Sequence, residues 1–177
     1  AHHLGWQAVG ISDRFSCGGL VRAHMAIKDI AAQNNPDQKP VASLSLDKLI
    51  CGVGVSLHNG GDILCYSRTL DGYHSLCQWL SAAMMRSGHN NRALPDMHIS
   101  DLVRLSSDVI VITLPPVLAD TDYREQARTI RLFAPGDVYV GGYLMRDGCD
   151  EERLYRLSQE AAADNLGFVA LGHVLYH

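Results

Sequence analysis

The stretch that decides the fold is Leu49-Ile50-Cys51-Gly52-Val53-Gly54-Val55-Ser56-Leu57, followed by His58-Asn59-Gly60-Gly61-Asp62 and then Ile63-Leu64-Cys65-Tyr66. Two apolar runs rich in β-branched residues flank a short polar turn. An Asn-Gly pair in that turn supplies the positive φ angles that a tight hairpin demands. Leu49–Leu57 and Ile63–Tyr66 are therefore predicted to form two antiparallel strands.

Outward from this hairpin, short apolar runs alternate with longer segments of helical period. Before it, Gln7–Ser12 predicts a strand and Gly19–Gln33 a helix, which Pro36 brings to an end. After it, the predicted elements are a helix Leu70–Arg86, a loop Ser87–Pro95, a short helix Asp101–Leu105 capped by Ser100, a strand Asp108–Leu114, a helix on Tyr123, Ala127, Ile130 and Ala134, a strand Asp137–Met145, a helix Glu151–Asp164 capped by Asp150, and a strand Gly167–Leu171.

The order of these elements, β-α-ββ-α-α-β-α-β-α-β, predicts an α/β fold. We expect a mostly parallel sheet or barrel with helices outside. The chain has 177 residues, which suits one domain over residues 1–177. An apolar content of 47% with 19% charged residues is typical of a globular protein.

Charge and hydropathy exclude some classes of function. The formal net charge of −4 argues against tight nonspecific binding of nucleic acid. No apolar run approaches the roughly 18–20 residues of a membrane span, and the start of the chain lacks the pattern of a signal peptide. We expect a cytoplasmic protein without a membrane partner.

The five cysteines are widely spaced, odd in number and contain no C-x-x-C pair. A zinc knuckle or a disulfide framework needs closer, paired spacing. Free thiols in a reducing compartment are therefore expected.

In parallel α/β folds, chemistry collects at the carboxyl ends of the strands. Asp13 directly follows the first predicted strand and could ligate a cation, although the neighbouring Arg14 opposes a metal and Asp13 could equally cap a turn or helix. His173 follows the last strand and could be a metal ligand or a hydrogen-bonded histidine. Asp13 and His173 are the candidate metal residues.

Three arginines, Arg124, Arg128 and Arg131, repeat at positions i, i+4 and i+7 of a predicted helix and share one face. Such a face could contact a phosphate backbone or an acidic partner, or could simply be solvated. No P-loop, no G-x-G-x-x-G opening a helix and no G-x-S-x-G nucleophile elbow occur. Nucleotide cofactors and a nucleophilic triad therefore have no support.

Several segments together resemble a known family. They are Leu4-Gly5-Trp6-Gln7-Ala8-Val9-Gly10-Ile11-Ser12-Asp13 with Gly18-Gly19-Leu20-Val21-Arg22-Ala23-His24, Ile50-Cys51-Gly52-Val53-Gly54-Val55, Asp71-Gly72-Tyr73-His74-Ser75-Leu76-Cys77, Ile99-Ser100-Asp101-Leu102, Leu114-Pro115-Pro116, Arg146-Asp147-Gly148, and Val169-Ala170-Leu171-Gly172-His173-Val174-Leu175-Tyr176-His177. In this order they resemble the polymerase-and-histidinol-phosphatase (PHP) domain, most closely that of the alpha subunits of bacterial C-family DNA polymerases of the error-prone branch. The resemblance spans nearly the whole chain.

The departures from the family pattern bear on activity. The resemblance implies an initial His-x-His strand, which would precede residue 1. It also implies a Thr-Asp-His motif where this chain has Ser12-Asp13-Arg14, and a metal-bridging glutamate where it has Gly54. A closing Asp-x-His aligns with His173-Val174-Leu175. Of these positions only Asp13 keeps the family's residue, and a polynuclear metal centre needs several converging ligands.

The sequence thus predicts a degenerate PHP-like domain. Its fold would be a distorted TIM-type barrel with the first strand of the family's barrel absent. The resemblance implies a structural or accessory role in DNA replication or repair synthesis, with a polymerase core or replication and repair proteins as partners and only indirect contact with DNA. No cofactor is expected, Zn or Mn at a remnant site being the alternative. An active metal-dependent phosphoesterase, or a stand-alone protein- or DNA-interaction module, are the rival hypotheses.

Overall fold

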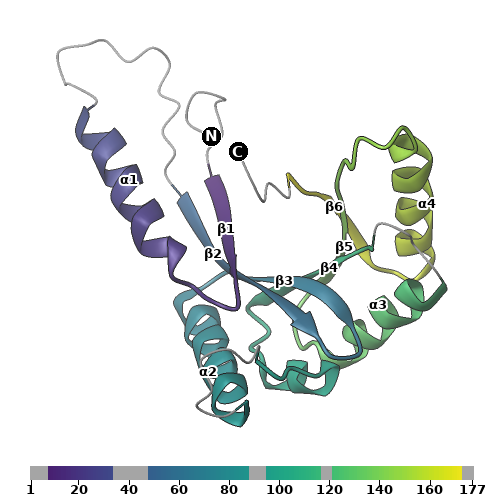
Figure 1. Cartoon of the computed structure of the whole chain (residues 1–177), viewed down its shortest axis with the longest axis horizontal. Helices are drawn as coiled ribbons and strands as arrows, with labels where there is room; N and C mark the ends of the chain where they lie inside the picture. The colour runs from purple at the N-terminus through teal and green to yellow at the C-terminus, as the bar shows by residue number, and fades with distance from the viewer. Residues whose placement is uncertain (1–7, 34–47, 88–94, 117–120, 173–177) are drawn as a thin grey trace.

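A single curled sheet organises the chain in the computed structural model, which describes residues 8–33, 48–87, 95–116 and 121–172. Six strands lie in sequence order across it: β1 (Ala8–Arg14), β2 (Lys48–Leu57), β3 (Gly61–Ser67), β4 (Val109–Leu114), β5 (Val138–Gly142) and β6 (Gly167–Ala170). The β1/β2, β4/β5 and β5/β6 pairs are parallel, whereas β2/β3 and β3/β4 are antiparallel. The expected α/β architecture with a mostly parallel sheet is confirmed, in the form of an open half-barrel (Figure 1).

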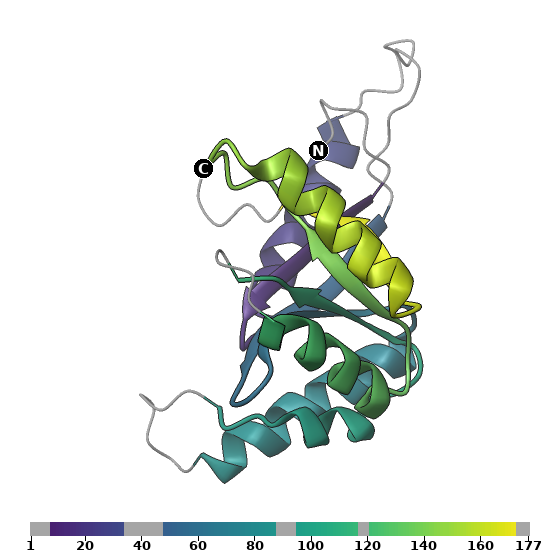
Figure 2. The same ribbon diagram turned by 90° about the vertical axis from the view of Figure 1, so that its right-hand side faces the viewer.

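The helices cover one face of the sheet, and they are α1 (Gly19–Gln33), α2 (Leu70–Arg86), α3 (Thr121–Phe133) and α4 (Asp150–Ala163), with a 3₁₀ helix η2 over Ile99–Arg104. Figure 2 shows α2, α3 and α4 along the same side of the sheet. α1 packs on β1 and β2 and projects from the other end of the molecule (Figure 1). No helix among the described residues is long and apolar enough to cross a membrane.

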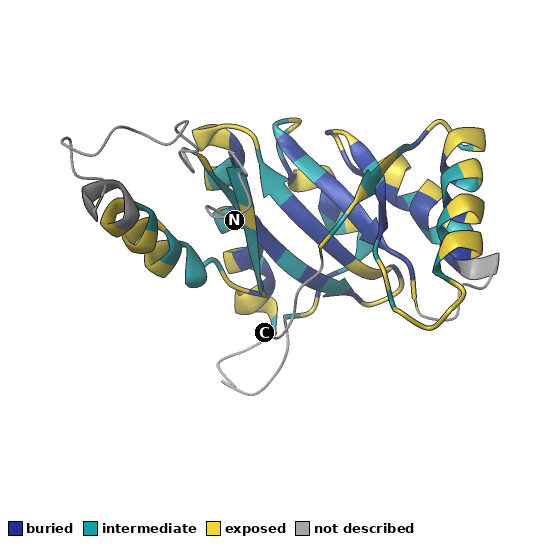
Figure 3. Cartoon of the chain, turned by 90° about the horizontal axis from the view of Figure 1, so that it is seen from above, coloured by how far each residue is buried: buried dark blue, intermediate teal, exposed yellow. Residues whose placement is uncertain are grey.

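The main core lies between the sheet and these helices. Alternate residues of each strand face it because side chains in a strand point to opposite faces with a period of two. On β2 these are Val53, Val55 and Leu57, and on β3 Ile63 and Cys65, all essentially buried. In Figure 3 the buried residues run through the strands, while the outer faces of the helices are exposed.

The predicted hairpin is confirmed, but its turn differs from the expected type. The positive φ angle falls on Gly61 and not on Asn59 or Gly60. A Cβ on Gly60 would come within 2.7 Å of the side chain of Ile99, so close packing explains the glycine at this position. The Asn-Gly pair thus predicted the position of the turn correctly, but Gly60 is there because of close packing and not because of a positive φ angle.

Two predicted element boundaries were wrong around β5 and α4. The strand expected over Asp137–Met145 spans only Val138–Gly142, and α4 begins at Asp150 with Cys149 at the N-cap position. The carboxylate of Asp150 accepts hydrogen bonds from the backbone N–H groups of Met145 and Arg146, both at 2.8 Å. Because a side chain satisfies these donors, the backbone leaves the sheet early.

The short helix and the helix α2 differ in how they begin. The expected Ser100-capped helix is the 3₁₀ helix Ile99–Arg104, which starts one residue before Ser100 and has His98 at its N-cap position. α2 begins as expected at Leu70, where the hydroxyl of Thr69 accepts from the N–H of Gly72 at 3.1 Å.

Candidate functional site on the concave face of the sheet

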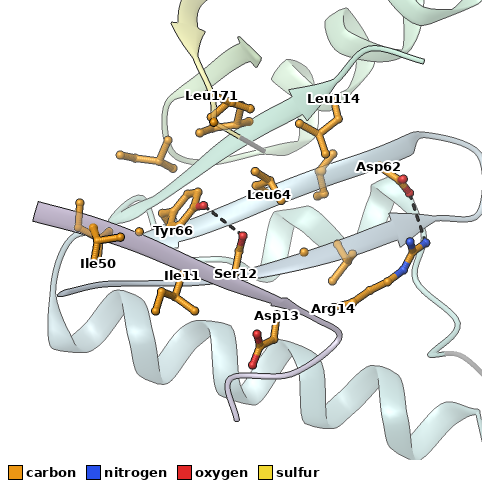
Figure 4. A pocket seen from close by; sticks show the side chains of 18 of the residues that line it. Ile11, Ser12, Asp13, Arg14, Ile50, Asp62, Leu64, Tyr66, Leu114 and Leu171 are labelled. Atoms are coloured by element: carbon orange, nitrogen blue, oxygen red, sulfur yellow. Dashed lines mark hydrogen bonds and ion pairs between the residues drawn. The ribbon is translucent and has the colours of Figure 1, made fainter. Parts of the chain in front are cut away.

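The concave face of the sheet forms a groove of about 900 Å³. Its lining comes from the whole of β1, from residues along β2 and β3, from β4 and from the end of β6. A sheet that curls without closing leaves its inner face open to solvent, and Figure 4 shows side chains from these strands converging on that space.

The inner wall of the groove is apolar. Leu64, Ile112 and Leu114 form a second buried cluster, separate from the core under the helices. The half-buried apolar side chains packed against it are Tyr66, Ile110, Tyr139, Tyr143, Val169 and Leu171. This composition matches a face that binds apolar groups and contrasts with the solvated face of an ordinary open sheet.

Tyr66 occupies the part of the groove over β1 and β2. Cβ atoms added to Gly10 and Gly52 would lie 3.0 Å and 2.4 Å from its ring, so these two glycines make room for it. Its hydroxyl donates to Oγ of Ser12 at 3.1 Å (Figure 4). The ring therefore fills space that would otherwise extend the groove along β1.

A short polar network lies at the hairpin end of the groove. The guanidinium of Arg14 donates to Ser56 Oγ, the Ser56 hydroxyl donates to the carboxylate of Asp62, and Arg14 Nη2 lies 3.8 Å from Asp62 Oδ1 (Figure 4). Gly54 sits beside them on β2 and contributes no side chain. The Asp62 charge is thus already compensated by Arg14, and both side chains are more than half exposed.

Asp13 lies on the opposite side of β1 from this network. Ser12 and Arg14 face the groove, and the period of two places Asp13 on the helix side. Its carboxylate accepts the N–H of Gly19, the first residue of α1, which is the helix-capping role that the sequence left open. Among the residues that the structure describes, no three His, Cys, Asp or Glu side chains come together as a metal site.

His173, the other candidate metal ligand, lies outside the described residues. The chain is described up to Gly172, which lines the groove beside Leu171. The possibility that His173 binds a metal therefore stays a prediction.

Arg124, Arg128 and Arg131 are the arginine stripe expected on α3. Arg124 and Arg128 both bind the carboxylate of Asp164, at 2.8 and 2.6 Å, and that carboxylate is 5% exposed. The two guanidinium groups hold the pKa of Asp164 well below its usual range. Arg131 donates to the carbonyl oxygen of Gly136. All three guanidinium groups thus have a partner within the chain, and contact of this stripe with DNA or a partner stays a prediction.

Sequence reasoning missed the aromatic residues that pack against the apolar cluster of Leu64, Ile112 and Leu114. Tyr143 donates its hydroxyl to the carbonyl oxygen of Pro115 at 2.7 Å, and burial raises its pKa, so it stays protonated. The sequence does carry part of this information, because Leu64 and Tyr66 alternate with Ile63 and Cys65 and so share the opposite face of the strand. Only the curl of the sheet brings them opposite β6.

Comparison with known proteins gives one consistent result. The chain is 27% identical over its whole length to an error-prone DNA polymerase of Brucella abortus, 30% identical to one of Rhodopseudomonas palustris, and 29% identical to error-prone DNA polymerase 2 of Agrobacterium fabrum. It spans about 15% of the length of each of these relatives. No family model matches the chain. The chain is a domain related to a segment of error-prone DNA polymerases.

Proposed function

We propose that this chain is a PHP-like accessory domain of an error-prone DNA polymerase, cytoplasmic, and without phosphoesterase activity. The observation that carries the proposal is that similarity to these polymerases covers the whole chain but only a short part of each relative. A segment of that size is typical of one domain within a larger protein. The surface of this chain should then offer faces that other parts of such a protein can cover.

Loss of the metal centre is supported by what stands at the end of the groove. The resemblance implies a ligand glutamate at Gly54 and a histidine at Arg14, and here Arg14 is tied to Ser56 and Asp62. A fixed positive charge at the mouth raises the free energy of any cation placed there. Asp13, the one aligned position that keeps the family's residue, instead accepts a hydrogen bond from the backbone N–H of Gly19 at the start of α1.

An accessory, structural role is supported by the open concave face. Its apolar wall resembles the inside of a covered sheet, and β1 and β6 are edge strands of the described sheet with unpaired backbone groups on their outer sides. A longer polymerase can supply both missing partners, namely apolar side chains for the groove and backbone groups for the edges. The proposed partner of this face is the remainder of the polymerase.

The first experiment tests the loss of activity. The chain is purified without chelator, analysed for bound Zn and Mn, and assayed with a generic phosphodiester in the presence of either metal. We expect less than one metal per chain and no turnover above buffer. Two or three bound metals with hydrolysis abolished by Asp13→Asn would establish the rival active phosphoesterase, with Asp13 and His173 as its ligands.

The second experiment tests the accessory role. This chain replaces the corresponding segment of the Rhodopseudomonas palustris polymerase, and primer extension is measured. We expect the chimera to be soluble and active, and Ile50→Asp in the groove to reduce solubility and extension at least several-fold. Leu132→Asp on the exposed outer face of α3 is the matched control and should leave both unchanged. Equal behaviour of the two variants would contradict a role for the groove.

A further inference from the structure

The turn between β2 and β3 contains the one Asn-Gly pair of the sequence, Asn59-Gly60. Asn59 is exposed, and its side-chain amide makes no hydrogen bond to another residue that the structure describes. The described part of the chain therefore does not hold this carboxamide in one rotamer. The positive φ angle of the turn falls on Gly61, so the backbone conformation does not require an asparagine at position 59.

Gly60 supplies a backbone nitrogen that can react with this carboxamide. Because a glycine has no Cβ, its nitrogen stays open to the side-chain γ-carbon of the preceding residue, where a larger residue would hinder the approach. The Gly60 N–H donates to the carbonyl oxygen of Leu57 at 3.4 Å, which is longer than an ordinary N–H···O hydrogen bond. A donor that is held so weakly is readily released for reaction.

Two Asp-Gly pairs could undergo the same ring closure, but the fold restrains both. In Asp71-Gly72 the glycine lies in the first turn of α2, and its N–H donates to Thr69 Oγ1 at 3.1 Å. In Asp147-Gly148 the carboxylate accepts hydrogen bonds from the backbone N–H of Cys149 and from Arg153, which hold the pKa of Asp147 below its usual range. An ionised carboxylate is a poor electrophile, so this pair should react slowly.

We propose that Asn59-Gly60 is a site of spontaneous deamidation, with water as the only co-reactant. The Gly60 nitrogen attacks the γ-carbon of Asn59, the new C–N bond closes a five-membered succinimide, and the side-chain nitrogen leaves as ammonia with the Gly60 proton. Water then adds to one of the two ring carbonyls and breaks its bond to the Gly60 nitrogen. Opening at the side-chain carbonyl leaves an aspartate at position 59, and opening at the backbone carbonyl leaves an isoaspartate. One water is consumed and one ammonia is released.

The two products change the turn in different ways. Both add a negative charge three residues before Asp62, at the hairpin end of the groove. Isoaspartate also lengthens the main chain by one methylene next to Gly60, where an added Cβ would lie 2.7 Å from the side chain of Ile99. The His58 N–H ties the same turn to the carbonyl oxygen of Met97 at 2.8 Å. Isoaspartate should therefore disturb the contact between the hairpin and the segment that leads into η2.

The test incubates the folded chain at mildly alkaline pH, beside a synthetic peptide of residues 55–65 as the unstructured reference. We expect the intact mass to rise by about 1 Da, and peptide mapping to place the change and the isoaspartate at position 59. Asn165 is the internal control, because the N–H of the following Leu166 donates to the carbonyl oxygen of Ala161 at 2.8 Å, and it should stay unchanged over the same period. The isoaspartate form, separated by ion exchange, should unfold a few degrees below the parent chain.

Variants separate the reaction from its consequence. Asn59→Gln keeps an amide in the turn and should abolish the mass change, because a glutamine would have to close a six-membered ring. Asn59→Asp carries the product charge without the longer main chain, so its thermal midpoint should lie near that of the parent and above that of the isoaspartate form. A reference peptide that deamidates while the folded chain does not, a first change at any other asparagine, or the same mass change in Asn59→Gln would each overturn the proposal.

Discussion

The two faces of the sheet use the same strands in opposite ways. On the helix side, Val53, Ile63 and Val111 are at most 1% exposed and pack against helices of this chain. On the concave side, Ile50, Tyr66 and Ile110 are only half-buried and line a groove. Both sets are apolar, so the difference lies in what covers them and not in residue type.

Residues on the helix side are covered by helices of this chain, whereas those on the concave side are only partly covered by the described residues. Strands that are apolar on both faces are characteristic of sheets covered on both sides. Here one cover, formed by α2, α3 and α4, is part of the described chain (Figure 2). The concave face has the apolar composition of a covered surface, which supports the proposal that it contacts the rest of a larger polymerase.

The largest expected effect is on the helix side. Ile63→Ala removes a fully buried side chain and should lower the free energy of unfolding by about 2–5 kcal/mol, through lost burial and a cavity that packing cannot refill. Urea unfolding measured by circular dichroism gives this value. Leu132→Ala, at an 83% exposed position of α3, should change it by less than about 0.5 kcal/mol.

The second prediction concerns the fit of Tyr66 inside the groove. Gly52→Ala places a Cβ 2.4 Å from the Tyr66 ring and 3.1 Å from the carbonyl oxygen of Cys65, and should cost about 1–3 kcal/mol by overpacking. In a Tyr66→Ala background the same substitution should cost clearly less, because the ring is gone. Additive effects in this double-mutant cycle would show that Tyr66 does not lie over Gly52.

Much of the fold followed from local pattern. The hairpin, the order of strands and helices and the extent of α2 were all predicted, because apolar period and turn residues act over a few neighbouring positions. The end of β5 was not, because it depends on Asp150 capturing the N–H groups of Met145 and Arg146. The hydrophobic periodicity of the sequence does not show where a side chain will take hydrogen-bond donors away from a β-sheet.

The site was less predictable than the fold for a similar reason. Asp13 was correctly placed at a strand end, but which face it occupies depends on the pairing of β1 with β2 and on the position of Gly19. The apolar groove arises from the curl of the sheet, which no single strand encodes.

The third prediction tests what holds the helical cover together. Asp164 follows α4 and binds Arg124 and Arg128 of α3, so Asp164→Asn should lower the free energy of unfolding at pH 7 by about 1–2 kcal/mol. The pKa of Asp164 is lowered in the folded state by the two arginines. Its contribution is therefore complete above the ordinary aspartate pKa of 3.8 and declines as pH falls toward the folded value.

Urea unfolding of both proteins from pH 7 to pH 3 gives the measurement. The difference between parent and Asp164→Asn should shrink as pH falls through and below 4. Asp137→Asn is the control, because its partner Arg68 and Asp137 itself are both largely exposed, and it should leave the free energy of unfolding nearly unchanged. A pH-independent difference for Asp164→Asn would exclude the ion pairs as its cause.

The smallest effect is expected on the concave face. Ile50→Thr keeps a β-branched side chain suited to a strand and removes apolar surface that is only half-buried, so the free energy of unfolding of the isolated chain should fall by less than about 1 kcal/mol. Urea unfolding beside Ile63→Ala gives the contrast directly. A loss as large as that of Ile63→Ala would mean that Ile50 is already covered within this chain, and the distinction between a folding face and an associating face would fail at that position. A small loss of unfolding free energy would show that the apolar side chain of Ile50 adds little to the stability of the isolated chain. That result is expected if, as proposed, this side chain contacts another part of a longer polymerase.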